Sequence, residues 1–180
     1  MYENHLFDKL KPSERLEYEL MDESNMVQLL RIFKEDDNPY VTEDYKDLKK
    51  LKKYYKEMQQ LRITQSKLAG HDWFIRLKDT GTFIGVISIY ELSRETINEN
   101  DRKCSLGFAI GDAYQRHHYA TEAIYNIFEF VKNELGRSLV LAYTQDGNLA
   151  SKLLLQKIGF EDVTDEYMGG PDVRFYHLEI

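Results

Sequence analysis

The feature that most constrains the fold is a helix with an apolar stripe that lies between two short apolar strands. Within residues 117–133, apolar side chains recur at the spacing of one helix face, at Ala120, Ala123, Ile124, Ile127, Phe128 and Val131. The flanking segments CSLGFAI (104–110) and SLVLAYT (138–144) have the composition of strands, and the second is mostly apolar, as expected for a strand covered on both faces. This arrangement predicts a layered α/β domain.

The rest of the chain extends this alternation. We expect strands at 15–21, 71–78, 82–92, 161–168 and 172–179, and helices at 22–33, 43–61 and 148–159. Asp79-Thr80-Gly81 predicts a hairpin turn, Thr42 and Asn148 are expected helix N-caps, and Gly159 is suited to end the last helix. The resulting order, βααβββαβαββ, is an α/β three-layer pattern.

Length, charge and cysteine content limit the class of protein. The 180 residues fit one domain, which we expect to cover 1–180. The net charge of −7 argues against nucleic acid and anionic membranes as partners, and no run of about 18 apolar residues is present. The charged N-terminal segment does not resemble a signal peptide, and the single Cys104 rules out an internal disulfide, so we expect a cytoplasmic protein.

The stretch AIGDAYQRHHYATEA, residues 109–123, has the pattern of a strand that turns directly into a helix. The N-terminus of a helix exposes backbone N–H groups that suit a diphosphate, and Arg116, His117 and His118 could add side-chain donors. An ordinary connection remains an alternative, because most strand-to-helix turns bind nothing. A metal site fits less well, because the adjacent histidines point to different faces and no His or Cys follows at a spacing of four residues.

A second motif further along changes this balance. LGFAIGDAYQRHHYATEA followed by NLASKLLLQKIGFE resembles the GNAT superfamily of N-acetyltransferases that use acetyl-CoA, and it is similar to the branch that contains the ribosomal-protein N-terminal acetyltransferases. SERLEYELMDESNMVQLLRIF also resembles the first strand and helix of that branch. The resemblance implies a GNAT-type three-layer fold, a mixed central sheet of about seven strands flanked by four helices, and acetyl-CoA as co-substrate without a metal.

The resemblance also implies roles for particular residues. The cofactor would be held by the fourth strand, by the loop before the helix and by an asparagine, at Phe108, Ala109, Ile110, Gln115, Arg116, His117, His118, Tyr119, Ala120 and Asn148. The loop departs from the family pattern, because Arg116 and His118 stand where glycine is usual, while Ala120 is an allowed variant at the second loop glycine. Ser105 replaces a frequent glutamate, and Leu155 replaces the tyrosine that many members use as general acid. His118 must keep a negative φ or accept backbone strain.

The implied reaction is direct attack of a primary amine, on a small molecule or a protein N-terminus, on the acetyl carbonyl. A backbone N–H near a bulge in the fourth strand would polarise the carbonyl oxygen. Glu91 is the candidate base and Ser151 the candidate acid, although each also fits an ordinary structural position. Tyr90 and Tyr143 are candidates for lining the acceptor pocket.

Two other functional hypotheses remain open. One is a degenerate GNAT-fold module that binds acyl-CoA without turnover, and the other is a protein-interaction domain that uses the lysine-rich helix of 43–61. The sequence also leaves the oligomeric state open, a homodimer included. It does not identify the acyl acceptor.

Overall fold

The computed structural model describes residues 10–64, 70–90, 103–167 and 170–180. The strands in these ranges are β1 (Leu16–Leu20), β2 (His71–Leu77), β3 (Phe83–Tyr90), β4 (Lys103–Ile110), β5 (Leu139–Gln145), β6 (Glu161–Asp162) and β7 (Val173–Glu179). The α-helices are α1 (Gln28–Phe33), α2 (Leu48–Thr64), α3 (Tyr119–Asn133) and α4 (Leu149–Ile158). In the described part of the chain, no helix is long and apolar enough to cross a membrane.

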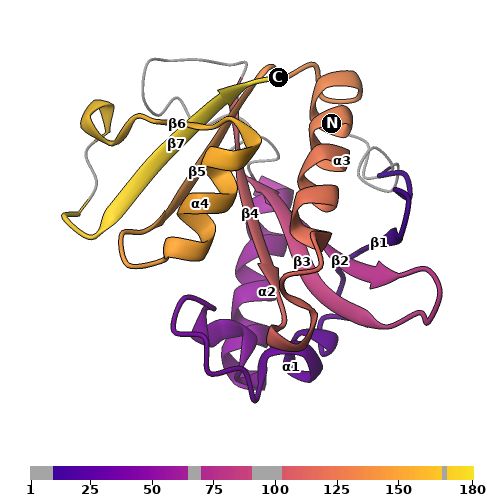
Figure 1. Ribbon diagram of the computed structural model, residues 1–180. Helices are drawn as coiled ribbons and strands as arrows, with labels where there is room; N and C mark the ends of the chain where they lie inside the picture. Colours follow the sequence, from indigo (N-terminus) through magenta and orange to yellow (C-terminus); the bar gives the residue numbers. More distant parts are fainter. Residues whose placement is uncertain (1–9, 65–69, 91–102, 168–169) are drawn as a thin grey trace.

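The strands form one mixed sheet in the order β1-β2-β3-β4-β5-β7-β6. All neighbouring strands are antiparallel except β4 and β5, which are parallel and joined by the α3 crossover. Helices cover both faces of the sheet, with α1 and α2 on one side and α3 and α4 on the other (Figure 1). The seven strands, four helices and three layers confirm the expected fold class.

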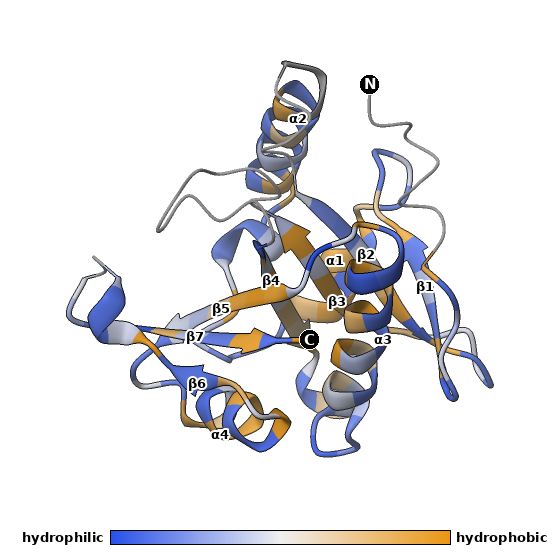
Figure 2. Ribbon diagram, turned by 90° about the horizontal axis from the view of Figure 1, so that it is seen from above, coloured by the Kyte–Doolittle hydropathy of each residue, from blue (hydrophilic) through white to orange (hydrophobic). Residues whose placement is uncertain are grey.

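The two faces of the sheet bury two separate cores, because side chains alternate along a strand. On β2, Trp73 and Ile75 belong to the core under α3 and α4, whereas Phe74 between them belongs to the core under α1 and α2. Figure 2 shows apolar residues concentrated on the strands and hydrophilic residues over the outer sides of the helices. The alternation therefore fixes which strand residues reach which of the two cores.

The last two helices follow the sequence pattern closely. The apolar stripe of α3 is buried, with Ile124 and Val131 fully inaccessible. Asn148 caps α4 by accepting a hydrogen bond from Ser151 N at 3.2 Å. Gly159 ends α4 at φ 113°, and Phe160 N bonds back to Leu155 O. These are the signals that sequence reasoning used, and the structure confirms them.

Three expected elements are shorter than predicted, and the same cause explains each. The helix expected at 22–33 is reduced to α1, the helix expected at 43–61 breaks into a 3₁₀ turn (Glu43–Tyr45) and α2, and the strand expected at 161–168 is reduced to β6. At each break an aspartate accepts hydrogen bonds from nearby backbone N–H groups: Asp22 from Ser24 and Asn25, Asp47 from Lys50, and Asp162 from Thr164. These local bonds compete with helix and strand pairing.

The strands β4 and β5 pair over only part of their length. Lys103 to Leu106 stand opposite Leu139 to Ala142, and beyond these positions the two strands diverge (Figure 1). On its other side β4 stays paired with β3 as far as Ile110 and without a register shift. The bulge expected in the fourth strand is therefore absent from the β3–β4 pairing, where both strands are described. A register shift lies instead between β2 and β3, at Ile75 and Arg76.

Gly85 on β3 lies where this strand approaches β4 closely, next to the split. A Cβ atom at Gly85 would lie 2.3 Å from the backbone oxygen of Ala109 and 2.8 Å from Cδ1 of Ile110. Because a backbone oxygen cannot move aside, we expect Gly85→Ala to lower the free energy of unfolding by about 3 kcal/mol. Urea denaturation measures this loss. Gly170→Ala is the matched control, since nothing lies within 4 Å of its added Cβ. Equal stability of the two variants would contradict the close approach.

Candidate functional site

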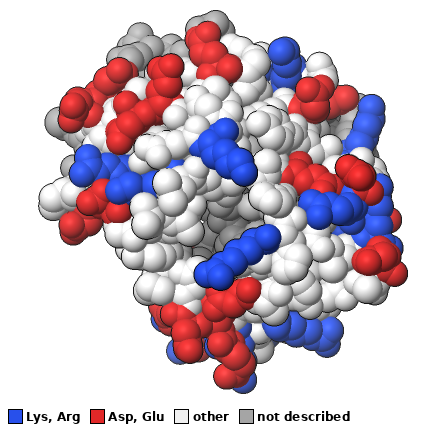
Figure 3. Space-filling view, in the orientation of Figure 1, with Lys and Arg blue, Asp and Glu red and all other residues white. Residues whose placement is uncertain are grey.

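Two cavities adjoin at the split between β4 and β5. The first, here called the α3–α4 cavity, has a volume of about 380 Å³ and lies among the end of β4, the start of α3, the start of α4 and the loop after α1. The second, the α2 cavity, has a volume of about 570 Å³ and is lined by α2, β2, β3, β4 and Tyr143 of β5. Both are lined by Tyr40, Val41, Phe108 and Ala109, so the end of β4 is their common wall. Figure 3 shows a hollow on the face seen in Figure 1, with basic side chains beside it.

The loop between β4 and α3 has an unusual backbone. Arg116 has φ 65° and His118 has φ 64°, so both are left-handed although neither is glycine. These are the two positions at which the sequence departs from the glycine pattern. Left-handed backbone costs a residue with a Cβ about 1–3 kcal/mol. Of the two options expected for His118, a negative φ or strain, the structure shows strain.

This strained turn leaves a run of backbone donors without partners. Among the described residues, no group accepts a hydrogen bond from the N–H groups of residues 116–121. His118 is the N-cap of α3 and its side chain makes no capping bond. Successive N–H groups in such a turn form a concave anion site, and the positive end of the helix dipole adds to it. The donors therefore suit a phosphate group at the α3–α4 cavity.

The side chains of the loop divide into two groups. Arg116, His118, Tyr119 and Ala120 line the α3–α4 cavity. His117 does not line it: its Nδ1 lies 2.7 Å from Gln115 O and its ring stacks on Tyr119 with centroids 5.6 Å apart. The structure thus places His117 behind the loop, as a support and not as part of the cavity wall.

Gln115 serves mainly to fold the turn. Its Nε2 donates to Ile110 O at 3.0 Å and to Asp112 Oδ1 at 2.9 Å, which ties the loop to the end of β4. Burial raises the pKa of Asp112, and the neighbouring carboxyls of Asp36 and Asp37 raise it further. Gln115 also lines the α3–α4 cavity, so its position fits the expectation while its amide is already used within the loop.

The start of α4 supplies the opposite wall of the α3–α4 cavity. Asn148 and Ser151 both line it, together with Leu154 one turn further on. The Asn148 Oδ1 atom is used in the helix cap, which leaves the side-chain amide as the donor it can present to a ligand. Ser151 lies in the first turn of α4 and is half-buried. Both residues therefore lie on one wall of this cavity.

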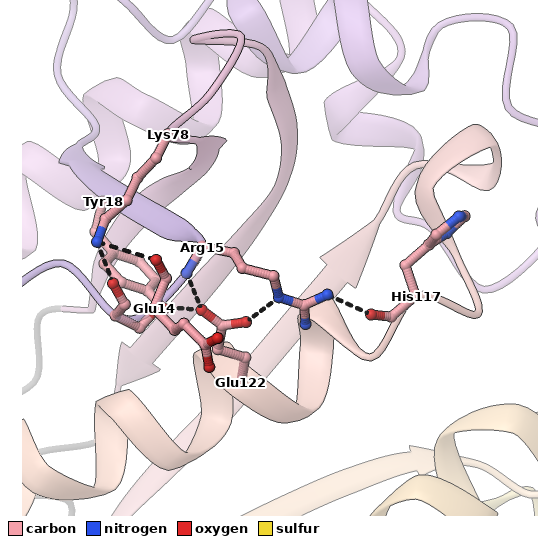
Figure 4. A network of polar contacts seen from close by, with 7 residues as sticks. Glu14, Arg15, Tyr18, Lys78, His117 and Glu122 are labelled. Atoms are coloured by element: carbon pink, nitrogen blue, oxygen red, sulfur yellow. Dashed lines mark hydrogen bonds and ion pairs between the residues drawn. The ribbon is translucent and has the colours of Figure 1, made fainter.

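The loop is also held from outside by the segment before β1 (Figure 4). Arg15 Nε donates to Glu122 Oε2 at 2.8 Å, and Arg15 Nη1 donates to His117 O at 3.1 Å. Glu122 Oε1 accepts further hydrogen bonds from Arg15 N and Ser13 Oγ, both at 2.7 Å. Burial raises the pKa of Glu122, but these hydrogen bonds lower it more, so the net shift is downward from 4.5.

The α2 cavity has a different chemical character. Asp72, which is 4% exposed, accepts hydrogen bonds from Ser88 Oγ at 2.5 Å and from the hydroxyl of Tyr54 at 3.3 Å. Burial and the nearby Asp72 carboxyl raise the pKa of Tyr45 well above 10. Tyr90 and Tyr143, both expected near an acceptor, line this cavity with their rings edge to face at 6.1 Å. The wall is therefore rich in aromatic rings and hydroxyl groups.

Several candidate residues lie elsewhere. Glu91, the candidate base, lies outside the described residues. Ser105 and Leu155, which replace common family residues, are buried in the sheet and the core at 2% and 0% exposure. Sequence reasoning missed Asn38, Tyr40 and Val41, which reach the α3–α4 cavity from the loop after α1. No local signal marks them, because only the tertiary fold brings that loop to the end of β4.

Neither metal nor thiol chemistry has support among the described residues. They contain no group of three or more His, Cys, Asp or Glu side chains arranged to hold a metal ion. Cys104 is 1% exposed, and burial raises the pKa of its thiol to about 12. A protonated, buried thiol is a poor nucleophile. The candidate chemistry therefore rests on the loop, the helix N-terminus and the two cavities.

The acetyltransferase (GNAT) domain family matches residues 15–161 of this chain. The chain belongs to that family. A curated relative from Bacillus subtilis (strain 168), the uncharacterized N-acetyltransferase YoaA, is 32% identical over 101 residues, which are 55% of this chain and 54% of the relative. The match therefore spans about half the length of that curated relative.

Solved structures show the same fold at low sequence identity. A ribosomal L7/L12 α-N-protein acetyltransferase, RimL, in complex with coenzyme A has a TM-score of 0.70 at 15% identity, over 95% of this chain and 97% of that one. A putative ribosomal-protein-serine acetyltransferase from Vibrio cholerae has a TM-score of 0.68 at 18% identity, over 93% and 95%. A spermidine N-acetyltransferase SpeG chimera from Vibrio cholerae and hSSAT has a TM-score of 0.70 at 12% identity, over 92% and 96%. At these identities the likeness establishes the fold alone.

The strain at His118 is open to direct measurement. In His118→Gly the relief of the left-handed backbone, about 1 kcal/mol or more, offsets the entropy that glycine loses on folding, about 0.5–1 kcal/mol. We expect no net loss in the free energy of unfolding. His117→Gly is the control, because it removes the hydrogen bond to Gln115 and the stacking on Tyr119 with no strain to relieve. Denaturant unfolding should show His118→Gly to be more stable than His117→Gly by at least about 1 kcal/mol, and the reverse order would contradict the strain.

The lowered pKa of Glu122 makes stability depend on pH. A carboxyl with a lowered folded-state pKa contributes stability that is fully present above its unfolded value, here 4.5, and is lost as the pH falls through the folded value. We expect the free energy of unfolding to fall more steeply below about pH 4.5 in the wild type than in Glu122→Gln. Denaturant unfolding across this range measures the two slopes. Parallel curves would show that the carboxyl gains nothing from its hydrogen bonds.

Proposed function

We propose that this chain transfers the acetyl group of acetyl-CoA to a primary amine by direct attack, the amine being a small molecule or a protein N-terminus. One observation carries the proposal: the unpartnered N–H groups of residues 116–121 stand at the N-terminus of α3, beside the split between β4 and β5. This arrangement offers donors for a diphosphate next to an open strand edge. Membership of the GNAT family and the coenzyme A complex of RimL support it.

The α3–α4 cavity would hold the cofactor. The loop donors would bind the diphosphate, and the side chains of Arg116 and His118 could add contacts because both line the cavity. Beyond Leu106 no strand in the described part of the chain pairs with the β5-facing edge of β4, so the backbone of Phe108, Ala109 and Ile110 could bond to the amides of the pantetheine arm, apart from Ile110 O, which accepts from Gln115 Nε2. The side-chain amide of Asn148 would approach from the start of α4.

The α2 cavity would hold the acceptor. It adjoins the α3–α4 cavity at Phe108 and Ala109, so a molecule in it can reach an acetyl group held at the end of β4. Tyrosine rings favour a cationic nitrogen through their π faces, and Tyr90 and Tyr143 both contribute to this wall. The buried Asp72 adds a carboxyl to the same wall. These features support an amine as acceptor.

The acyl donor supplies a reactive thioester, so the protein must mainly position and desolvate the reactants. The nitrogen lone pair forms a bond to the carbonyl carbon, the carbon–sulfur bond breaks, and the sulfur leaves as thiolate. Ser151, at the wall of the α3–α4 cavity, is the candidate that returns a proton to the sulfur. Glu91 remains the candidate that takes the proton from the amine, directly or through water.

The decisive experiment separates binding from turnover. Isothermal titration of the full chain with acetyl-CoA should show binding, and addition of small amines and N-terminal peptides should release thiol with formation of the acetylated amine. Absence of heat at cofactor concentrations of several millimolar would overturn the proposed cofactor site. Binding without thiol release on any amine would instead favour a module that has lost turnover.

Two substitutions of Asn148 distinguish its role as a helix cap from a contact with the cofactor. Asn148→Ala removes both the helix cap and the side-chain amide, so it should lower the free energy of unfolding by about 1 kcal/mol and weaken acetyl-CoA binding several-fold. Asn148→Ser keeps a capping oxygen but lacks the amide, so it should retain stability and show the same loss of binding. Isothermal titration and denaturant unfolding measure the two effects. Wild-type affinity in Asn148→Ser would remove the assigned contact.

A further inference from the structure

Arg15 lies far from the loop in sequence, yet its side chain contacts the loop and the first turn of α3 at three points. Figure 4 shows two of them, the hydrogen bonds to His117 O and to Glu122. Arg15 Nη1 donates to His117 O at 3.1 Å, its guanidinium lies 4.7 Å from the centroid of the Tyr119 ring, and its Nε donates to Glu122 Oε2 at 2.8 Å. The contacts therefore bracket His118, the left-handed residue that precedes α3.

The segment that carries Arg15 is itself fixed in place. Glu122 Oε1 accepts hydrogen bonds from Ser13 Oγ and from Arg15 N, so the first turn of α3 is bonded to the backbone before β1. Lys78, in the turn after β2, donates to Ser13 O and to Glu14 O. The side chain of Glu122 is only 15% exposed. Arg15 thus reaches the loop from a base that is anchored to the sheet.

The contact with His117 O determines the direction of an amide. A trans peptide is planar, and its C=O and N–H point in opposite directions. By holding the carbonyl of His117, Arg15 directs the N–H of His118 away from itself. His118 lines the α3–α4 cavity whereas His117 does not. The bond therefore favours the orientation in which this donor is available to a ligand.

The loop needs such a restraint because its preferred conformation is a different one. Arg116 and His118 both carry a Cβ atom, and both are held at positive φ. Without an external restraint, each would relax toward negative φ, and the run of unpartnered N–H groups would lose its common direction. Glycine at the same positions would adopt either sign of φ without that penalty.

We propose that Arg15 is a positioning residue that holds the strained loop of residues 116–118 in the conformation that binds the diphosphate of the cofactor. Its contribution is specific to a loop without glycine, since it opposes the strain at Arg116 and His118. This inference rests on the proposed cofactor site, but the restraint itself exists in the protein without ligand.

A double-mutant cycle tests the proposal. We expect Arg15→Ala to weaken binding of acetyl-CoA by about tenfold in the wild-type loop, the factor that corresponds to relaxing one strained residue. In the background Arg116→Gly/His118→Gly the same change should weaken binding by less than about threefold. Isothermal titration of the four full-length proteins gives the coupling, and any direct phosphate contact of the replaced side chains cancels in the cycle.

One further variant, Arg15→Lys, distinguishes positioning of the loop from simple attraction by charge. Arg15→Lys keeps the positive charge, but an ammonium cannot bond in the same fork to Glu122 and His117 O. Positioning predicts that Arg15→Lys binds acetyl-CoA nearly as weakly as Arg15→Ala, with KM for the cofactor raised more than kcat is lowered. Wild-type affinity in Arg15→Lys, or an equal effect of Arg15→Ala in both loop backgrounds, would overturn the proposal in favour of long-range attraction.

The stability of the ligand-free proteins tests the restraint by Arg15 independently of the proposed function. In denaturant unfolding of the ligand-free proteins, the ratio of folded to unfolded protein should fall less on Arg15→Ala in the wild-type loop than in the glycine background, because relaxation of Arg116 and His118 recovers strain that a glycine loop does not carry. If the wild type fails to bind acetyl-CoA while this coupling is present, the proposed function fails and the restraint stands. If the wild type binds acetyl-CoA but neither titration nor unfolding shows coupling between Arg15 and the loop positions 116 and 118, the proposed restraint is wrong.

Discussion

The early end of the pairing between β4 and β5 is the constraint on which the rest of the structure depends. The strands share four paired positions, from Lys103 to Leu106 on β4, and then separate while each remains bonded to its outer neighbour. Beyond Leu106, the β5-facing edge of β4 has no partner strand among the described residues. Buried backbone donors and acceptors must be satisfied, so an opened edge inside a protein is a ready site for a ligand with amide groups. The start of α3 and the start of α4 stand on either side of this opening.

Two chemically different cavities adjoin at the same opening. The α3–α4 cavity has backbone donors, a helix N-terminus and basic side chains, and so it has the character of an anion site. The α2 cavity has tyrosine rings and the buried carboxyl of Asp72, and so it favours a cation. A reaction between an anionic acyl donor and an amine requires the two to meet while each is held by its own complementary wall. On β4, Phe108 and Ala109 line both cavities. The end of this strand is therefore where the two reactants would meet.

The sequence predicts the parts of this arrangement that depend on local signals. The stripe of α3, the cap of α4 at Asn148 and the candidate loop follow from spacing and residue type. The resemblance to the GNAT pattern names ten of the fourteen residues that line the α3–α4 cavity from β4 onward. Contributions that depend on tertiary contacts were missed, as Tyr40 and Val41 show, since nothing in the loop after α1 marks its approach to β4. The resemblance implies a cofactor role for His117, but its ring stacks on Tyr119 outside the lining of the cavity, which His118 reaches.

The replacement of glycine in the turn before α3 changes what the conformation of the turn depends on. A glycine loop adopts left-handed backbone without strain, and its shape is then set mainly by the ligand and by the flanking strand and helix. A loop with Arg116 and His118 gains side-chain donors at the cavity but requires the rest of the protein to impose its conformation. That requirement explains why a guanidinium from the segment before β1 bonds to a carbonyl inside the loop and to Glu122 on the first turn of α3. The strain of the loop and the hydrogen bonds that oppose it are therefore one unit, and a substitution in either part changes the effect of a substitution in the other.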